Sequence, residues 1–91
     1  MRFSEAVEQC MRGRKIRNMN WNGKNAFVYY VSAHMVNAKD WERDDLSETE
    51  EISGTVWVLG HFDMYTSSGE RLIGWAPSQA DMQSDKWVVM E

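Results

Sequence analysis

Two short motifs in this chain set an indole ring beside small hydrogen-bonding side chains. They are residues 21–24 (WNGK) and residues 75–81 (WAPSQAD). An indole offers a flat apolar face, while amide, hydroxyl and carboxyl groups offer hydrogen-bond donors and acceptors. This combination suits a pocket for a planar, polar small molecule such as a nucleotide base. The two motifs therefore favour a binding protein over an enzyme.

The motifs and their neighbours supply each kind of contact that such a ligand needs. Stacking of a base on an aromatic ring is worth about 1–3 kcal/mol, and selectivity comes from polar groups that a wrong ligand leaves unpaired. Phosphates attract arginine and lysine side chains. The residues predicted to bind the ligand are Trp21, Phe27 and Trp75 as stacking rings, Asn22, Ser78, Gln79 and Asp81 as hydrogen-bonding groups, and Arg17 and Lys24 as phosphate-binding cations.

Five of these nine residues also have a structural interpretation. The tryptophans of both motifs can fill the core or a subunit contact instead of a ligand site. Asn22-Gly23 can serve only for its turn geometry, and Ser78 with Asp81 only as helix caps. A third tryptophan, Trp87, lies in the apolar sequence near the end of the chain and is expected in the core.

Residues suited to catalysis or metal binding are sparse. The two histidines, His34 and His61, lie far apart in the sequence. The single cysteine, Cys10, lies in an amphipathic stretch, where a small buried hydrophobe is expected. The sequence contains no metal-ligand spacing, no phosphate-cradling glycine-rich loop and no nucleophile elbow. We therefore expect no enzymatic activity, no cofactor and no metal.

Length and charge narrow the classes of protein further. The 91 residues are expected to form a single small-ligand-binding domain over positions 1–91, and the 43% apolar content predicts that the chain folds. The formal net charge is -4, so a long nucleic acid is not expected as a partner. No apolar run approaches the roughly 20 residues of a membrane span and no signal peptide is recognisable, which favours the cytoplasm.

Two helices are predicted. The first runs from about Ser4, its predicted N-cap, to Arg12, because apolar residues repeat there at helical spacing and Gly13 follows as a stop. A second, short helix begins after Ser78, where Asp81 three residues later completes a capping box.

The remaining sequence predicts an antiparallel sheet. Asn22-Gly23 offers the two positive φ angles of a tight hairpin turn, and residues 67–70 form a turn cluster for a second hairpin. Residues 55–59 are apolar throughout, which predicts a strand that is buried on both faces or lies at a subunit contact. The predicted strands are residues 15–19, 26–32, 55–59, 61–66, 71–75 and 87–90.

The middle of the chain shows no sustained apolar period. Residues 36–53 carry seven of the fourteen acids and predict an exposed loop with a helical turn around Trp41, within a variable acidic loop over residues 34–54. The order of elements predicts an α+β domain. In it, an N-terminal helix packs on an antiparallel β-sheet of about five strands, and a short helix precedes the C-terminal strand.

Several motifs occur in an order that resembles the second Thoeris anti-defence family, a group of small phage proteins. The likeness covers residues 3–33 and 61–89 and is weak between them. It rests on FSEA at residues 3–6, GRKIR at 13–17, WNGK at 21–24, Asp63-Met64 before Gly69, and Trp75 followed by Ser78-Gln79, Asp81 and Trp87.

The resemblance implies a specific function. Members of that family act as molecular sponges, which bind the cyclic ADP-ribose signals made by bacterial TIR-domain immune enzymes and hold them without cleaving them. Some members also take up cyclic dinucleotides at a separate site. The family's usual assembly is a homotetramer with ligand pockets between subunits, and the implied location is the cytoplasm of the infected bacterial host.

Two positions depart from the family pattern. Pro77 stands where a larger apolar residue is common, and Lys86 stands where an acid is more usual. The first change alters the loop that enters the short helix, and the second alters the charge near the expected pocket. Both therefore bear on which cyclic isomer the protein prefers.

Two other functions use the same kinds of residue. An inhibitor of a host protein, acting by direct protein-protein contact, would use exposed tryptophan and tyrosine side chains as interface anchors. A single-strand nucleic-acid binder would combine the rings with a basic strip, and five of the ten basic residues do fall between positions 12 and 24. That second function needs a larger positive surface than this chain carries.

Overall fold

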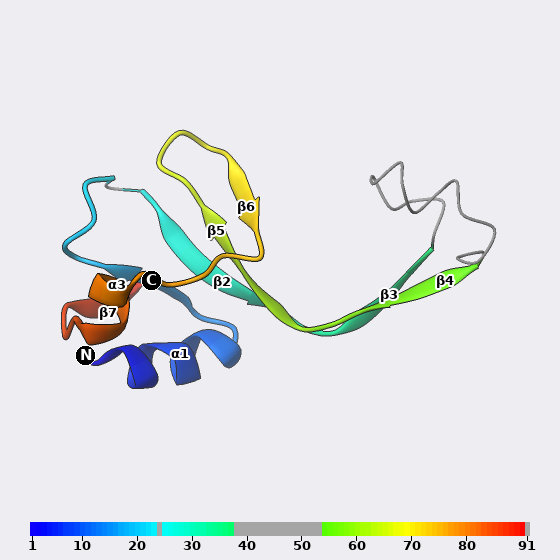
Figure 1. The fold of residues 1–91 in the computed structure, drawn as a ribbon, viewed down its shortest axis with the longest axis horizontal. Coiled ribbons are helices and arrows are strands. Elements are labelled where there is room, and N and C mark those ends of the chain that lie inside the picture. The colour runs from blue at the N-terminus through cyan, green and yellow to red at the C-terminus, as the bar shows by residue number, and fades with distance from the viewer. Residues whose placement is uncertain (24, 38–53, 91) are drawn as a thin grey trace.

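The computed structural model of this protein describes residues 1–23, 25–37 and 54–90. It confirms an α+β fold, with an N-terminal helix, a five-stranded antiparallel sheet and a short helix before the C-terminal strand (Figure 1). The elements are α1 (Phe3–Met11), β1 (Lys15–Asn18), β2 (Phe27–Val31), β3 (His34–Asn37), β4 (Thr55–Val58), β5 (His61–Tyr65), β6 (Arg71–Ile73), α3 (Gln79–Gln83) and β7 (Trp87–Met90).

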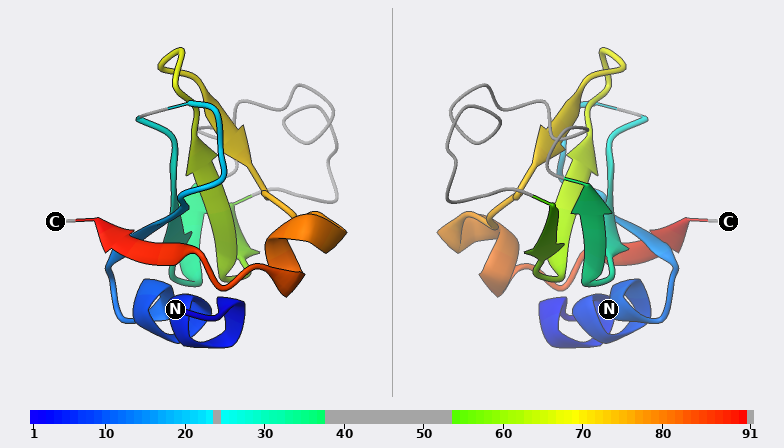
Figure 2. Two further views of the ribbon diagram at one scale, coloured as in Figure 1. Left: turned by 90° about the vertical axis from the view of Figure 1, so that its left-hand side faces the viewer. Right: turned by 90° about the vertical axis from the view of Figure 1, so that its right-hand side faces the viewer.

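The main sheet has the strand order β6-β5-β2-β1-β7, and every neighbouring pair is antiparallel. The last strand, β7, therefore lies at one edge, beside the first strand, and β6 lies at the other. Helix α1 packs against β1, β2 and β7 on one side of this sheet (Figure 2). None of the described helices is long and apolar enough to cross a membrane.

A small apolar core lies between α1 and the sheet. Its fully buried members are Ala6, Cys10, Ile16, Val28 and Trp87, which confirms the expected core positions of Cys10 and Trp87. Side chains alternate across a strand, so the neighbours of Val28 in β2 point to the other side of the sheet. That other side is the uncovered face of the sheet, and no described helix packs on it.

The two ends of α1 differ in how well the sequence predicts them. The helix begins at Phe3, so the prediction of Ser4 as N-cap is wrong. The Glu5 carboxylate accepts a hydrogen bond from the backbone N–H of Arg2 at 3.1 Å, which satisfies a donor at the helix start without Ser4. The predicted stop is confirmed: Gly13 has φ +99° and its N–H donates to the Cys10 carbonyl at 2.9 Å.

The connection between β1 and β2 is not the predicted tight turn. Neither Asn22 nor Gly23 has a positive φ, and the connection runs from residue 19 to residue 26. The chain turns earlier, at Asn18, whose side-chain oxygen accepts from the backbone N–H of Asn20 at 2.9 Å and whose carbonyl accepts from that of Trp21 at 3.1 Å. The longer connection carries Trp21 away from the sheet edge toward α3.

The structure adds a strand in the region predicted as a loop. Val36 and Asn37 lie in β3, which pairs with β4 as a two-stranded sheet. This sheet continues β2 and β5 in one unbroken register, from Val31 opposite His61 to His34 opposite Val58. Residues 38–53, with Trp41 and the acidic run, lie outside the described residues.

The predicted burial of residues 55–59 on both faces is wrong within one chain. Trp57 is 57% exposed and Leu59 is 73% exposed. Figure 1 shows why, because β3 and β4 project from the body of the domain where no other described strand or helix covers them. The alternative prediction, a subunit contact, remains a prediction.

Most predictions for the C-terminal part of the chain are confirmed. Strands β5 and β6 form the predicted hairpin, and Gly69 in its turn has φ +86°. The capping box is confirmed: the Asp81 N–H donates to Ser78 Oγ and the Ser78 N–H donates to Asp81 Oδ2, both at 3.0 Å. Strand β6 ends at Ile73, so Trp75 lies in the connection to α3 and not in the strand.

Candidate functional site

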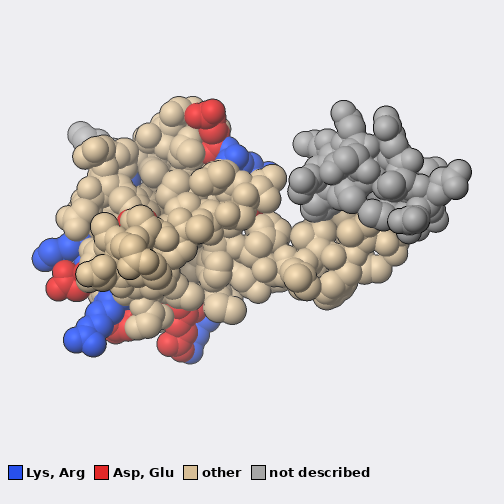
Figure 3. All heavy atoms as spheres, viewed as in Figure 1, with Lys and Arg blue, Asp and Glu red and all other residues tan. Residues whose placement is uncertain are grey.

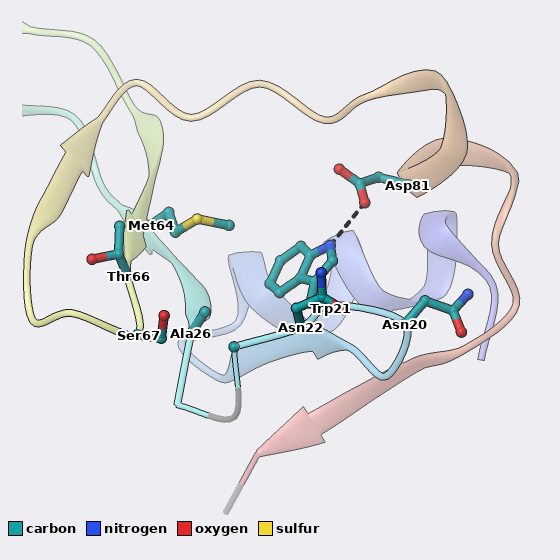
Figure 4. A pocket seen from close by; sticks show the side chains of 9 residues that line it. Asn20, Trp21, Asn22, Ala26, Met64, Thr66, Ser67 and Asp81 are labelled. Carbon is teal, nitrogen blue, oxygen red and sulfur yellow. Dashed lines mark hydrogen bonds between the residues drawn. The ribbon is translucent and has the colours of Figure 1, made fainter.

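A pocket of about 410 Å³ opens between the connection that follows β1, the end of β5 and the start of α3 (Figure 4). The parts of the chain that form it are far apart in sequence. Its lining residues are Asn20, Trp21, Asn22, Gly23, Ala26, Met64, Thr66, Ser67 and Asp81.

Trp21 is the largest side chain in this pocket, and three contacts fix its orientation. Its indole N–H donates a hydrogen bond of 2.9 Å to Asp81 Oδ1. Its ring meets Trp75 and Trp87 edge-on, with centroid distances of 6.2 Å and 5.3 Å. Half-buried and held on these sides, the indole presents a fixed apolar surface to the pocket (Figure 4).

Asp81 holds the tryptophans in place. One carboxylate oxygen accepts from Trp21, the other accepts from the Ser78 backbone, and the Asp81 carbonyl accepts from the Trp87 indole N–H at 2.8 Å. Partial burial acts to raise the pKa of the Asp81 carboxyl group. The hydrogen bonds from the Trp21 side chain and from the backbone and side chain of Ser78 outweigh it, so the pKa lies below its ordinary value. Asp81 is therefore an anion at neutral pH.

Other polar side chains that line the pocket are available to form hydrogen bonds with a ligand. Among the residues that the structure describes, the side chains of Asn20, Asn22 and Ser67 make no hydrogen bond. Two amides and a hydroxyl can donate to and accept from a base edge or a sugar hydroxyl. Met64 and Ala26 add apolar surface beside them. The pocket thus combines one held ring with unpaired neutral groups.

Cations are missing from the described lining of this pocket, whose single charged group is the Asp81 carboxylate. Arg17, a predicted phosphate ligand, lies in β1, and one of its guanidinium N–H groups donates to the Ala26 carbonyl at 3.3 Å. Lys24, the other predicted cation, lies outside the described residues. The described lining therefore suits the base and ribose parts of a nucleotide better than its phosphates.

The structure brings three of the nine predicted ligand-binding residues, Trp21, Asn22 and Asp81, to the pocket wall. Trp75 lies behind Trp21 and packs on the core, with its ring edge toward Trp87 at 6.3 Å. Ser78 caps α3 outside the lining, and the exposed Gln79 begins that helix. Phe27 and Arg17 lie in the sheet and are not among the residues that line the pocket.

Phe27 belongs to a second, shallow groove of about 420 Å³ on the uncovered face of the sheet. Its ring stacks on Tyr65 with a centroid distance of 5.3 Å and an angle of 16°, and Lys15 Nζ lies 4.7 Å from its centroid. The Arg71 guanidinium donates to the Tyr29 hydroxyl at 2.9 Å in the same groove. Here aromatic rings and cations occur together.

The sequence did not predict that the turn after β5, with Ser67, forms one wall of the pocket. Residues 67–70 were predicted as a turn, but nothing in the sequence indicates that this turn meets the connection after β1. A Cβ atom built at Gly23 would lie 2.7 Å from Cβ and Oγ of Ser67, so the two turns touch here. Glycine is required at position 23 for this close approach and not for a positive φ.

Comparison with known proteins places these features in a family context. A family model described as the Thoeris anti-defense 2-like domain matches residues 1–90 of the chain. Among curated proteins, Thoeris anti-defense 2 from Bacillus phage SP01 is similar, with 28% identity over 90 residues. The similar region covers 99% of this chain and 94% of that relative.

Proposed function

The chain belongs to the Thoeris anti-defense 2-like family, and we propose that it carries out the family's anti-defence role as a sponge for nucleotide signals. Its ligands would be cyclic ADP-ribose-type signals made by bacterial TIR-domain immune enzymes. The protein would bind and sequester these signals without degrading them, in the cytoplasm of the infected bacterium. It would silence the effector by mass action, so it must bind the signal more tightly than the effector does.

The observation that carries this proposal is the fixed indole of Trp21 beside unpaired side chains. Adenine can stack on the indole, while the Asn22 amide and the Ser67 hydroxyl are available for base edges and ribose hydroxyls. The ring is already held by Asp81, so little side-chain entropy is lost when a ligand binds. Tight capture without a chemical step is what such a pocket supports.

We propose further that the complete site lies between subunits of a homotetramer. Trp21 packs on the side of the sheet that α1 covers, whereas Phe27 lies on the uncovered face. A ligand that stacks on both rings would therefore sit between two chains. The same arrangement would bring Lys15, Arg17 or Arg71 of a second chain to the phosphates, for which the described lining of the pocket offers no cation. The groove around Phe27 is also the candidate for a separate cyclic dinucleotide site.

The test is ligand binding followed by recovery of the ligand. Cyclic ADP-ribose isomers are added to the purified protein, and the thermal unfolding midpoint and the bound fraction are measured, with linear ADP-ribose as the control. A ligand at a hundredfold excess over Kd stabilises the folded protein by about 2.7 kcal/mol. Heating should then release the cyclic isomer chemically unchanged. Recovery of a linear or hydrolysed product would overturn the non-catalytic part of the proposal.

A second candidate is inhibition of a host protein by direct contact. The exposed side chains of Met35 and Trp57, which face the same side of the β3–β4 ribbon, could anchor such a contact. The two functions separate experimentally. A host-protein inhibitor would co-elute with the purified TIR enzyme or its effector on size exclusion and would gain no stability from nucleotides, whereas a sponge would show the opposite pair of results.

A further inference from the structure

A buried carboxylate lies on the open side of the sheet, and the function proposed above gives it no role. Asp63 in β5 pairs with Tyr29, whose neighbour Val28 points into the core, so Asp63 and Tyr29 both point to the uncovered face. Asp63 is nevertheless only 1% exposed. Burial of a carboxylate costs free energy unless charges or hydrogen bonds compensate it. The groups that cover Asp63 therefore indicate what it is for.

Three groups surround the Asp63 carboxylate. The Gly74 N–H donates to Oδ1 at 3.0 Å, and His61 Nε2 lies 3.4 Å from the same oxygen. On the other side, Arg71 Nη2 lies 3.6 Å from Oδ2. The bond from Gly74 needs only an oxygen acceptor, which an asparagine would also offer. The negative charge therefore matters to the basic side chains, of which Arg71 is the permanent cation.

Arg71 is held in one orientation by two groups of the sheet. Its Nε–H donates to the Tyr29 hydroxyl at 2.9 Å, and its Nη2 faces Asp63. Nη1 has no hydrogen-bond partner in the part of the chain that the structure describes, and the side chain is 60% exposed. A planar guanidinium with one edge held and N–H groups left open is suited to a bidentate contact with a phosphate.

The other two cations of the uncovered face are positioned less firmly. Lys15 Nζ lies over the Phe27 ring, 4.7 Å from its centroid, and Arg17 donates to the Ala26 carbonyl at 3.3 Å. Neither forms an ion pair with any of the described residues. Arg71 is therefore the cation of this face whose orientation is set before a ligand arrives.

The distribution of charge favours a small anion over a long one. On the side of the molecule that Figure 3 shows, the basic side chains form separate groups and not one continuous patch. The whole chain has a net charge of -4. A nucleic-acid polymer needs many neutralised phosphates, whereas a single phosphate or diphosphate group needs one or two cations.

We infer that Asp63 positions Arg71 to bind a phosphate group in the groove on the uncovered face. That groove, of about 420 Å³, contains Lys15 as a second cation. Asp63 is buried, so it touches no ligand and acts only through the guanidinium. The inference rests on the proposed function for the ligand being a nucleotide, but inorganic pyrophosphate is enough to test it.

The first test measures pyrophosphate binding by titration calorimetry, with net charge controlled. The side chains of Arg71 and Arg12 are 60% and 65% exposed, and each lies beside an acid, Asp63 or Glu8. Arg71→Gln should weaken binding by at least about tenfold, because charge-assisted hydrogen bonds are lost. Arg12→Gln removes the same charge from α1 and should change the affinity by less than about twofold, because salt screens distant exposed charges.

Asp63→Asn separates positioning from simple electrostatics. The variant keeps an acceptor for Gly74 and removes a negative charge, so charge alone predicts tighter binding of pyrophosphate. Positioning predicts the opposite, because the released guanidinium must be ordered on binding, which should weaken affinity about three- to tenfold. In an Arg71→Gln background, Asp63→Asn should no longer weaken binding. Equal or tighter binding by folded Asp63→Asn would overturn the inference.

The wild-type protein gives a readout that does not depend on whether Asp63→Asn folds. In a proton–nitrogen correlation spectrum, the Nε–H signal of Arg71 is assigned by its absence from Arg71→Gln. It should shift as pyrophosphate is added, while the Arg12 signal stays in place, and an unmoved Arg71 signal would overturn the inference. Capture of cyclic ADP-ribose is scored separately. A protein that captures it with the Arg71 signal unmoved by pyrophosphate contradicts this inference alone, and one that binds pyrophosphate at Arg71 but captures no nucleotide contradicts the proposed function alone.

Discussion

Asp81 holds Trp21 from sixty residues away, through a hydrogen bond of 2.9 Å between its carboxylate and the indole N–H. Asp81 also takes part in the cap of α3, and its backbone carbonyl accepts a hydrogen bond from the Trp87 indole N–H. This one residue therefore connects the pocket, a helix and the core. This relationship makes Asp81 a positioning residue in our account. The ring it holds is the proposed stacking surface.

Replacing Asp81 should affect capture more than replacing its capping partner. Ser78→Ala removes one N-cap bond and should cost about 1 kcal/mol of stability, while the bond from Trp21 to Asp81 remains. Asp81→Ala keeps that N-cap bond, which uses the backbone N–H, but removes the bond from the Ser78 N–H to Asp81 Oδ2 and the bond from Trp21. Loss of the ring's hydrogen bond should weaken nucleotide binding by roughly five- to tenfold. Titration calorimetry on the two folded variants measures this. Equal losses of affinity would show that the bond to Trp21 has no part in binding.

Trp21→Phe should separate the stacking role of the indole from its hydrogen bond. Phenylalanine keeps an apolar ring but cannot donate to Asp81, so capture should weaken moderately and the fold should persist. Trp21→Ala removes the stacking surface as well, which is worth about 1–3 kcal/mol and so roughly 5- to 150-fold in Kd. Phe27→Ala is the companion variant for the uncovered face. Wild-type affinity in Trp21→Ala would mean that the site lies elsewhere.

The contact between the two turns predicts a rescue. Gly23→Ala places a Cβ atom 2.7 Å from Ser67, which should push the turns apart and cost about 1–3 kcal/mol as overpacking. Capture should weaken with stability, because both turns line the pocket. Adding Ser67→Gly removes the obstructing atoms and should restore most of the melting temperature. If the double variant melts no higher than Gly23→Ala, the turns do not meet as described.

Acid should weaken the fold through Asp81. Its pKa lies below its ordinary value in the folded protein, so the stability it provides is present above the unfolded pKa of about 3.9 and is lost as pH falls through the folded value. Urea unfolding from pH 6 down to about pH 3 should show this loss in the wild type. Asp81→Asn should lack that part of the pH dependence, and a parallel curve for the two proteins would contradict the assignment.

High pH should lower the stability of the fold through ionisation of Cys10. Burial raises the pKa of this thiol to about 11, so the unfolded chain loses its proton first as pH rises above an ordinary value of about 8.5. The stability that Cys10 provides is thus full below that value and declines toward pH 11. Iodoacetamide at about pH 8 should label the thiol only after denaturant is added, since the thiolate is the reactive form. Rapid labelling of the native protein would show that Cys10 is not buried.

Local patterns in the sequence predicted most of the elements. The helical spacing before Gly13 and the capping box at Ser78 depend on near neighbours, and both are found in the structure. Strand β3 was missed because a short ribbon that is apolar on both faces has no alternating pattern. The turn at Asn22-Gly23 was wrong because the glycine serves a contact with Ser67, and a sequence does not record such contacts.

The candidate site was harder to predict than the fold for the same reason. The types of residue were recognisable from the two motifs, and Trp21, Asn22 and Asp81 do meet in one pocket. Which face of the sheet Phe27 occupies depends on strand register, and the partners of Thr66 and Ser67 depend on how distant turns pack. Those relationships are set by tertiary packing, which local spacing does not encode.

The most direct test of the central claim is to ask what the protein retains from cells in which a TIR-domain defence has been activated. The purified protein is incubated with a filtered extract of those cells, washed and heated, and the released small molecules are identified by mass spectrometry. Trp21→Ala serves as the matched control. Our account predicts an intact cyclic ADP-ribose isomer released by the wild type and depleted in the variant. Release of no nucleotide, or of a linear product alone, would contradict it.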